Sequence, residues 1–269
     1  MKAASFDYHR GTSLADVVAS LVADPDARPF LGGQSLSPTM NLRLARPARL
    51  IDLKPIGLRD FAADESRFHL GAGHTHAAIE DGLVQDMTRG LLPHVAAGIA
   101  YRGVRNRGTF GGSLAHADPA ADWLTVLMLL NGSVHAMGPS GARAIAAADF
   151  VTGAYATALA GNEILTGCDL PRLSETARWG WCKVNRKTGA FADALGGAVL
   201  DGALCRVAVG AIDAAPMLLL ETSTALRAGG VPAAVDVAPV ECARLLTHLD
   251  ADGRALRGAA VVRALQGMH

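Results

Sequence analysis

Two glycine pairs, each beside hydroxyl side chains, are the best candidates for binding chemistry in this 269-residue sequence. Residues 31–35 read Leu-Gly-Gly-Gln-Ser, and residues 109–113 read Thr-Phe-Gly-Gly-Ser. Adjacent glycines let a backbone approach a ligand closely, and nearby hydroxyl groups can donate hydrogen bonds to phosphate oxygens. One such loop alone is more often an ordinary turn. Because the motif occurs twice, we interpret the two loops as a cradle for a diphosphate.

The elements that flank the two loops indicate how the loops are positioned. A strand over residues 28–31 leads into the first loop, and a helix over residues 37–44 follows it. A second helix is expected over residues 118–131, after the second loop. Ser37-Pro38 and Asp118-Pro119 are typical of an N-cap and a first helical position. We therefore expect each glycine loop to be followed by a capped helix.

Hydrophobic periodicity predicts the remaining elements. Before residue 171 we expect strands over residues 5–8, 49–53, 68–71 and 162–170, a hairpin over 133–137 and 143–146, and helices over 13–23, from about 77 and over 90–101. After residue 171 we expect strands over residues 179–185, 191–200 and 203–212, then helices over 221–228, 239–249 and 254–266. The character of the chain therefore changes near residues 171–178.

These elements predict an α+β protein made of two domains. The first domain, residues 1–174, combines small mixed sheets with helices and divides into subdomains of about 1–55 and 56–174. The second domain, residues 175–269, is a smaller α+β unit with an antiparallel sheet and helices. A chain of this length can bury a core in each domain.

Composition narrows the class of protein. Lys plus Arg and Asp plus Glu number 25 each, which argues against nucleic acid as a partner, since phosphate binding favours a basic excess. The four cysteines lie far apart, so four buried thiols in a reducing compartment are favoured over a structural metal or iron–sulfur site. No charged and apolar leader and no apolar run of about 18 residues is present. We expect a cytoplasmic protein without an integral membrane segment.

The segment after residue 71 offers a second, weaker candidate site. Residues 71–76 read Gly-Ala-Gly-His-Thr-His, which fails the dinucleotide-binding fingerprint at its last position. His74, His76 and Glu80 could be metal ligands, but no fourth ligand accompanies them. A helix capped by Thr75 is the simpler interpretation, and we assign no metal ligand.

With both loops in view, the sequence resembles the FAD-binding medium subunit of the molybdenum hydroxylases, the family of aerobic carbon monoxide dehydrogenases and xanthine dehydrogenases. The resemblance extends over essentially the whole chain. The matching motifs are Gly-Gly-Gln-Ser-Leu at 32–36, Leu-Ile-Asp-Leu at 50–53, Arg-Asn-Arg-Gly-Thr-Phe-Gly-Gly-Ser-Leu-Ala at 105–115, Asp-Pro-Ala at 118–120 with Asp122, Glu-Ile-Leu at 163–165, and Lys183 with Arg-Lys-Thr-Gly-Ala-Phe-Ala at 186–192.

The resemblance implies a PCMH-like FAD-binding domain whose two glycine loops wrap the FAD diphosphate with backbone N–H groups. Asp122 matches an aspartate that binds the nucleoside end of FAD, and Lys183 matches a lysine near the isoalloxazine edge. Ala100 and Leu165 match positions that touch the cofactor through backbone or apolar contact. The implied cofactor-binding residues are Leu31, Gly32, Gly33, Gln34, Ser35, Leu36, Ala100, Thr109, Gly111, Gly112, Ser113, Asp122, Leu165 and Lys183.

The same resemblance implies an oxidoreductase subunit that passes electrons through FAD. In such enzymes a large molybdopterin subunit hydroxylates the substrate, and a small subunit carries two [2Fe–2S] clusters. This chain would take electrons from the clusters and release them to quinone, NAD or oxygen, within a dimer of heterotrimers. No residue of this chain is expected to be catalytic. An acidic residue is common in relatives where Ala190 stands, which leaves the flavin potential and the acceptor open.

Two alternatives remain open from the sequence. A self-contained flavin oxidoreductase would need a proton-handling residue near its substrate, for which His74, His76 and Tyr101 are the candidates. A flavin-free assembly or scaffold subunit would have kept the fold without the cofactor, although the intact glycine loops argue against it.

Overall fold

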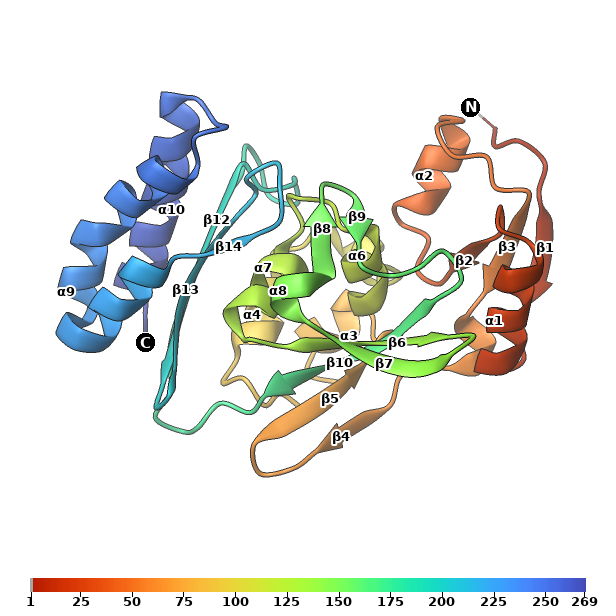
Figure 1. The fold of residues 1–269 in the computed structure, drawn as a ribbon, viewed down its shortest axis with the longest axis horizontal. Coiled ribbons are helices and arrows are strands. Elements are labelled where there is room, and N and C mark those ends of the chain that lie inside the picture. Colours follow the sequence, from red (N-terminus) through yellow and green to blue (C-terminus); the bar gives the residue numbers. More distant parts are fainter. Residues whose placement is uncertain (1) are drawn as a thin grey trace.

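The protein, described here from a computed structural model over residues 2–269, consists of three sheet-and-helix parts in chain order (Figure 1). The N-terminal part lies at one end of the molecule, the two long C-terminal helices lie at the other, and a five-stranded sheet with several short helices lies between them. The α+β class and the small sheets expected from the sequence are confirmed.

The N-terminal part is a three-stranded parallel sheet flanked by helices. Its strand order is β1-β3-β2. Helix α1 begins as expected, because the Ser13 side chain accepts a hydrogen bond from the Asp16 N–H, and its buried face carries Val17, Val18 and Leu21. The elements are β1 (Asp7–Arg10), α1 (Leu14–Ala23), β2 (Arg28–Phe30), α2 (Leu36–Asn41), β3 (Arg49–Asp52) and the short 3-10 helix η1 (Lys54–Ile56).

The central part is an antiparallel sheet in the order β4-β5-β10-β6-β7. Alternate residues of its three middle strands face the core, where Phe68, Leu70, Val134 and Leu170 are buried. The strands are β4 (Phe61–Ala63), β5 (Arg67–Gly71), β6 (Ser133–Gly138), β7 (Gly141–Ala146) and β10 (Ile164–Pro171), with a small hairpin of β8 (Val151–Gly153) and β9 (Ala156–Thr157). The helices are α3 (His76–Glu80), α4 (Leu91–Ala97), α5 (Arg102–Arg105), α6 (Phe110–His116), α7 (Asp122–Leu129) and α8 (Ala147–Phe150).

The C-terminal part is a four-stranded antiparallel sheet covered by two long helices (Figure 1). Glycines let α10 approach the sheet closely: a Cβ atom at Gly180 would lie 1.9 Å from the Ala264 carbonyl oxygen. Helix α9 is kinked at Gly230, whose φ of 71° is left-handed. The elements are β11 (Arg178–Val184), β12 (Ala194–Asp201), β13 (Leu204–Gly210), β14 (Met217–Leu218), α9 (Leu220–Leu245) and α10 (Ala251–Gln266).

Several expected helix boundaries were wrong. The helix expected from Asp118 begins at Asp122, because the Asp118 carboxylate accepts from the Ala120 N–H and closes a turn instead. The second glycine loop is itself the first turn of α6, capped by Thr109. Helix α2 begins at Leu36, which leaves Pro38 in the first turn, where no intrahelical N–H is needed.

Two further helices differ from the sequence-based expectation. The helix expected over residues 90–101 is shorter, since α4 ends at Ala97 and Ala100 has a left-handed φ of 46°; a separate helix, α5, begins at Arg102. The helices expected over residues 221–228 and 239–249 both lie within α9, separated at Gly230 by its non-helical φ and ψ, but the second of them begins before residue 239. Within residues 2–269, no helix combines the length and the apolar character needed to cross a bilayer.

Candidate functional site

The two glycine loops and the C-terminal sheet surround one pocket with a cavity volume of about 510 Å³. This volume is within the range of small-molecule and cofactor sites. All fourteen residues singled out from the sequence line this pocket, although they come from all three parts of the chain. They are Leu31, Gly32, Gly33, Gln34, Ser35, Leu36, Ala100, Thr109, Gly111, Gly112, Ser113, Asp122, Leu165 and Lys183.

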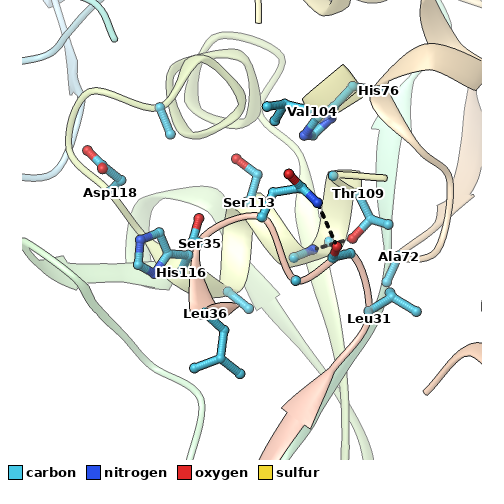
Figure 2. A pocket seen from close by; sticks show the side chains of 18 of the residues that line it. Leu31, Ser35, Leu36, Ala72, His76, Val104, Thr109, Ser113, His116 and Asp118 are labelled. Carbon is cyan, nitrogen blue, oxygen red and sulfur yellow. Dashed lines mark hydrogen bonds between the residues drawn. The ribbon is translucent and has the colours of Figure 1, made fainter. Parts of the chain in front are cut away.

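The backbones of the two glycine loops touch each other. A Cβ atom at Gly32 would lie 2.5 Å from the Arg107 carbonyl oxygen and 3.0 Å from the Gly108 Cα atom, so only glycine fits there. Gly33 has a left-handed φ of 71°. Figure 2 shows the side chains of Ser35 and Ser113, one from each loop, at the same pocket. The loops therefore form one binding surface.

The first loop keeps its hydrogen-bond donors free. Within the described chain, the backbone N–H groups of residues 32–35 and the hydroxyl groups of Ser35 and Ser113 donate to no protein acceptor. An anion at the pocket would satisfy them. The second loop differs, since the Gly111 N–H donates to Ala72 and the Gly112 N–H to the Thr109 hydroxyl. The expectation that both loops offer backbone N–H groups is therefore wrong for these two glycines.

A buried ion pair forms another wall of the pocket. The Lys183 ammonium group donates to a carboxylate oxygen of Asp122 at 2.8 Å, and the two side chains are 11% and 5% exposed. Burial raises the pKa of Asp122, and the Lys183 charge partly opposes this increase. The other Asp122 oxygen is buried and has no donor among residues 2–269. A ligand N–H or hydroxyl group would supply the missing donor.

The residues that line the pocket fit a large cofactor with an anionic centre. N–H and hydroxyl groups without a protein acceptor lie at the glycine loops, and one Asp122 carboxylate oxygen has no donor among residues 2–269. Apolar residues such as Leu31 and Leu165 line other parts of the pocket. Residues 4–173 match the family described as "FAD binding domain in molybdopterin dehydrogenase". The chain belongs to this family. It is an oxidoreductase subunit, and its cofactor is FAD.

Relatives of the molybdopterin dehydrogenase FAD domain align with most of the chain. The nicotine 6-hydroxylase medium subunit of Paenarthrobacter nicotinovorans is 36% identical over 208 residues, which is 77% of this chain and 73% of that protein. The carbon monoxide dehydrogenase medium chain of Afipia carboxidovorans is 38% identical over 201 residues, 73% of this chain and 69% of that protein. The resemblance inferred from the two loops is confirmed.

Solved structures of the same kind match the fold along its full length. Reconstituted CO dehydrogenase from Oligotropha carboxidovorans has a chain that superposes with a TM-score of 0.92 at 31% identity, covering 99% of this chain and 98% of that one. Quinoline 2-oxidoreductase from Pseudomonas putida 86 has a chain with a TM-score of 0.86 at 30% identity, covering 99% of both. The FAD domain and the C-terminal part therefore share the arrangement seen in these enzymes.

The Asp122–Lys183 contact was not expected from the sequence. Asp122 was assigned to the nucleoside end of FAD and Lys183 to the isoalloxazine edge. The two side chains are hydrogen-bonded to each other at 2.8 Å, so they reach the pocket wall together, and the two assignments stay predictions. This pairing joins residues 61 positions apart in sequence, so no local pattern could reveal it.

The side chains weighed as metal ligands after residue 71 of this FAD domain have protein partners instead. The buried His76 ring accepts a hydrogen bond at Nδ1 from the Trp123 indole N–H at 3.0 Å, and Glu80 is bound by Arg105. Thr75 caps α3 as expected by accepting from the Ala78 N–H. His76 lines the pocket and was not among the assigned FAD residues. The Trp123 contact fixes its tautomer, with the proton on Nε2.

We expect His76 to make the FAD domain less stable in acid. Burial lowers the pKa of His76 from 6.5 to about 4, so the unfolded chain takes up a proton between these values that the folded chain does not. The free energy of unfolding should therefore fall by about 3 kcal/mol as the pH drops through this range. Denaturant unfolding of the wild type and His76→Gln across pH 4–7 measures the difference. Parallel pH profiles would contradict the prediction.

Ala100 of the FAD domain, whose φ is a left-handed 46°, is held by a network of charged side chains. The Arg105 guanidinium donates to the Ala100 carbonyl oxygen at 2.8 Å and to the Glu80 carboxylate at 2.7 Å. Arg102 binds Glu80 and Asp81. These arginines therefore shape the pocket wall instead of meeting a ligand charge. Strained backbone held in this way is common at binding sites.

Proposed function

We propose that this chain is the electron-transfer subunit of a heteromeric molybdenum hydroxylase. In this proposal electrons come from [2Fe–2S] clusters on a small partner subunit, which are reduced by a large molybdopterin subunit. They leave through FAD to an external acceptor, which is quinone, NAD or oxygen. The observation that carries the proposal is the single pocket in which free backbone donors, an orphaned carboxylate oxygen and apolar walls meet.

The fourteen pocket residues have distinct proposed roles toward FAD. The free N–H groups of residues 32–35 and the hydroxyls of Ser35 and Ser113 hold the diphosphate. Asp122 accepts from a polar group of the cofactor, and Lys183 keeps that carboxylate charged. Leu31, Leu36 and Leu165 supply apolar contact, while Gly111 and Gly112 allow close approach. FAD, when bound, supplies the redox chemistry, and this chain supplies binding and orientation.

Of His74, His76 and Tyr101, the proton-handling candidates that the sequence offered, only His76 lines the pocket, which favours electron transfer over a self-contained oxidoreductase. His76 is held neutral and hydrogen-bonded to Trp123, and Asp122 is paired with Lys183. Tyr101 is 55% exposed and Phe191, beside the flavin-facing turn with Ala190, is 64% exposed. Exposed aromatic side chains beside a cofactor pocket suit contact with another subunit.

The relatives are named medium subunit or medium chain, which supports an assembly with larger and smaller partner subunits. We propose a dimer of heterotrimers in the cytoplasm, with this medium subunit between the large and small subunits. Within it, residues 1–174 form the FAD-binding domain, with subdomains of about 1–55 and 56–174, and residues 175–269 form the C-terminal domain. Lys183 lines the pocket wall, which supports a part for the C-terminal domain in holding the cofactor.

The test is reconstitution with the proposed partners. The chain is produced alone and together with its neighbouring subunits, and FAD is identified after acid release. When the FAD-loaded chain is mixed anaerobically with the reduced iron–sulfur subunit, the flavin absorption should decrease because FAD is reduced. FAD that is reduced directly by a small substrate, without any partner, would support the self-contained oxidoreductase. A complex without flavin would support the scaffold.

A further inference from the structure

Three titratable side chains come together on the central sheet, outside the pocket lining. His69 on β5, Asp169 on β10 and His135 on β6 lie on neighbouring strands, and their ligand atoms are all within 4.8 Å of one another. None of them lines the FAD pocket. We propose that they bind a Zn²⁺ ion through two imidazoles and one carboxylate, a site that neither the sequence nor the family indicates.

Strand pairing places the three side chains on one face of the sheet. His69 lies opposite Asp169, and His135 lies opposite Gly167, two positions before Asp169 on β10. Residues two apart on a strand share a face. The opposite face carries the buried core, so this face is the outer one, and the three side chains are 23–32% exposed.

Gly167 leaves the space between the two rings open. A Cβ atom at this position would lie 2.4 Å from the His69 Nε2 atom, so any larger residue would push that ring away. The two imidazole ring centroids are 5.4 Å apart. The glycine therefore allows both rings to turn toward Asp169.

The Asp169 carboxylate lies between the two imidazoles, hydrogen-bonded to His69 but not to His135. His69 Nδ1 lies 2.8 Å from one Asp169 oxygen, and His135 Nε2 lies 2.8 Å from the other. Despite this short distance, His135 Nε2 is buried and makes no hydrogen bond of acceptable geometry within residues 2–269. A Zn²⁺ ion would take the place of the proton in the His69–Asp169 hydrogen bond and would give His135 Nε2 a partner, with the side chains moving apart to admit the ion.

Asp60 completes the arrangement as a supporting residue. Its carboxylate lies 3.2 Å from His69 Nε2, the ring nitrogen that faces away from Asp169. Histidines that bind zinc commonly donate their other N–H to a carboxylate, which fixes the ring orientation. Two histidines and one carboxylate leave one position open for water, the usual pattern of a three-ligand zinc site. The ion would join strands β5, β10 and β6. Strand β10 also carries Leu165, which lines the pocket.

The test uses tag-free full-length chain and measures zinc binding directly. We expect the wild type to retain one Zn²⁺ per chain after dialysis, to show the visible absorption of tetrahedral Co²⁺ when cobalt replaces zinc, and to unfold at a higher temperature with zinc present. His135→Ala should bind at least about tenfold more weakly, and Asp60→Asn about tenfold more weakly. FAD content should stay unchanged in both variants, which shows that they are folded.

His9→Ala is the matched control. His9 also contacts a carboxylate, Asp16 at 3.1 Å, but belongs to no three-residue cluster in the part of the chain that the structure describes. It should bind zinc as the wild type does. Equal zinc affinity in the wild type and His135→Ala, or no zinc retained by the wild type, would show that the three side chains form only a polar surface cluster.

Discussion

Gly32→Ala should weaken FAD binding by about 10- to 100-fold, since forcing a methyl group into a packed position costs about 1–3 kcal/mol. The added Cβ atom would lie 2.5 Å from the Arg107 carbonyl oxygen and 3.1 Å from the Thr109 nitrogen. Backbone atoms cannot move aside as a flexible side chain can, so the two glycine loops must separate. Titration calorimetry of the apo chain with FAD measures the loss.

Gly103→Ala is the control for this glycine substitution. Gly103 lies in α5, only a few residues before the second loop, and an added Cβ atom there meets no heavy atom within 4 Å. Its FAD affinity should equal that of the wild type, and alanine should slightly stabilise the helix. If Gly32→Ala binds FAD as tightly as Gly103→Ala does, the two loops do not form one cradle.

Lys183→Met should destabilise the apo chain by about 3–5 kcal/mol, because removing one partner of a buried ion pair leaves an uncompensated charge. Asp122 would then be buried with neither carboxylate oxygen paired to a cation. For a chain of this size the thermal unfolding midpoint should fall by about 10 °C. FAD affinity should fall as well, since Lys183 orients the carboxylate that faces the pocket.

A double variant separates the charge pair from the loss of the lysine side chain. Adding Asp122→Asn to Lys183→Met removes the buried charge, so most of the lost stability should return. Lys187→Met, in the exposed turn that follows β11, is the matched control and should leave the midpoint unchanged. If the two substitutions at Asp122 and Lys183 are simply additive, the pair does not contribute as a unit.

Local patterns identified much of the secondary structure in this chain. Ser13 and Thr75 begin helices where their side chains can accept a backbone N–H three residues later, and β6 has the alternation that a half-buried strand requires. These signals can be recognised in the sequence because a helix N-cap and the alternation of a strand each depend on only a few neighbouring residues. The helix predicted to begin at Asp118-Pro119 was wrong, because an aspartate side chain that can cap a helix can also close a turn.

The sequence alone determined the family and the cofactor, because short motifs at the two glycine loops carry backbone requirements that few residues satisfy. All fourteen residues that it indicated as cofactor-binding line the pocket, although it did not indicate His76, which lines the pocket too. Tertiary structure decided what those residues do: that Lys183 binds Asp122, that His76 is held by Trp123, and that the second loop's N–H groups are occupied. It also brought His69, His135 and Asp169 together from three strands. These contacts join residues far apart in the chain, and only strand register and domain packing fix such distances.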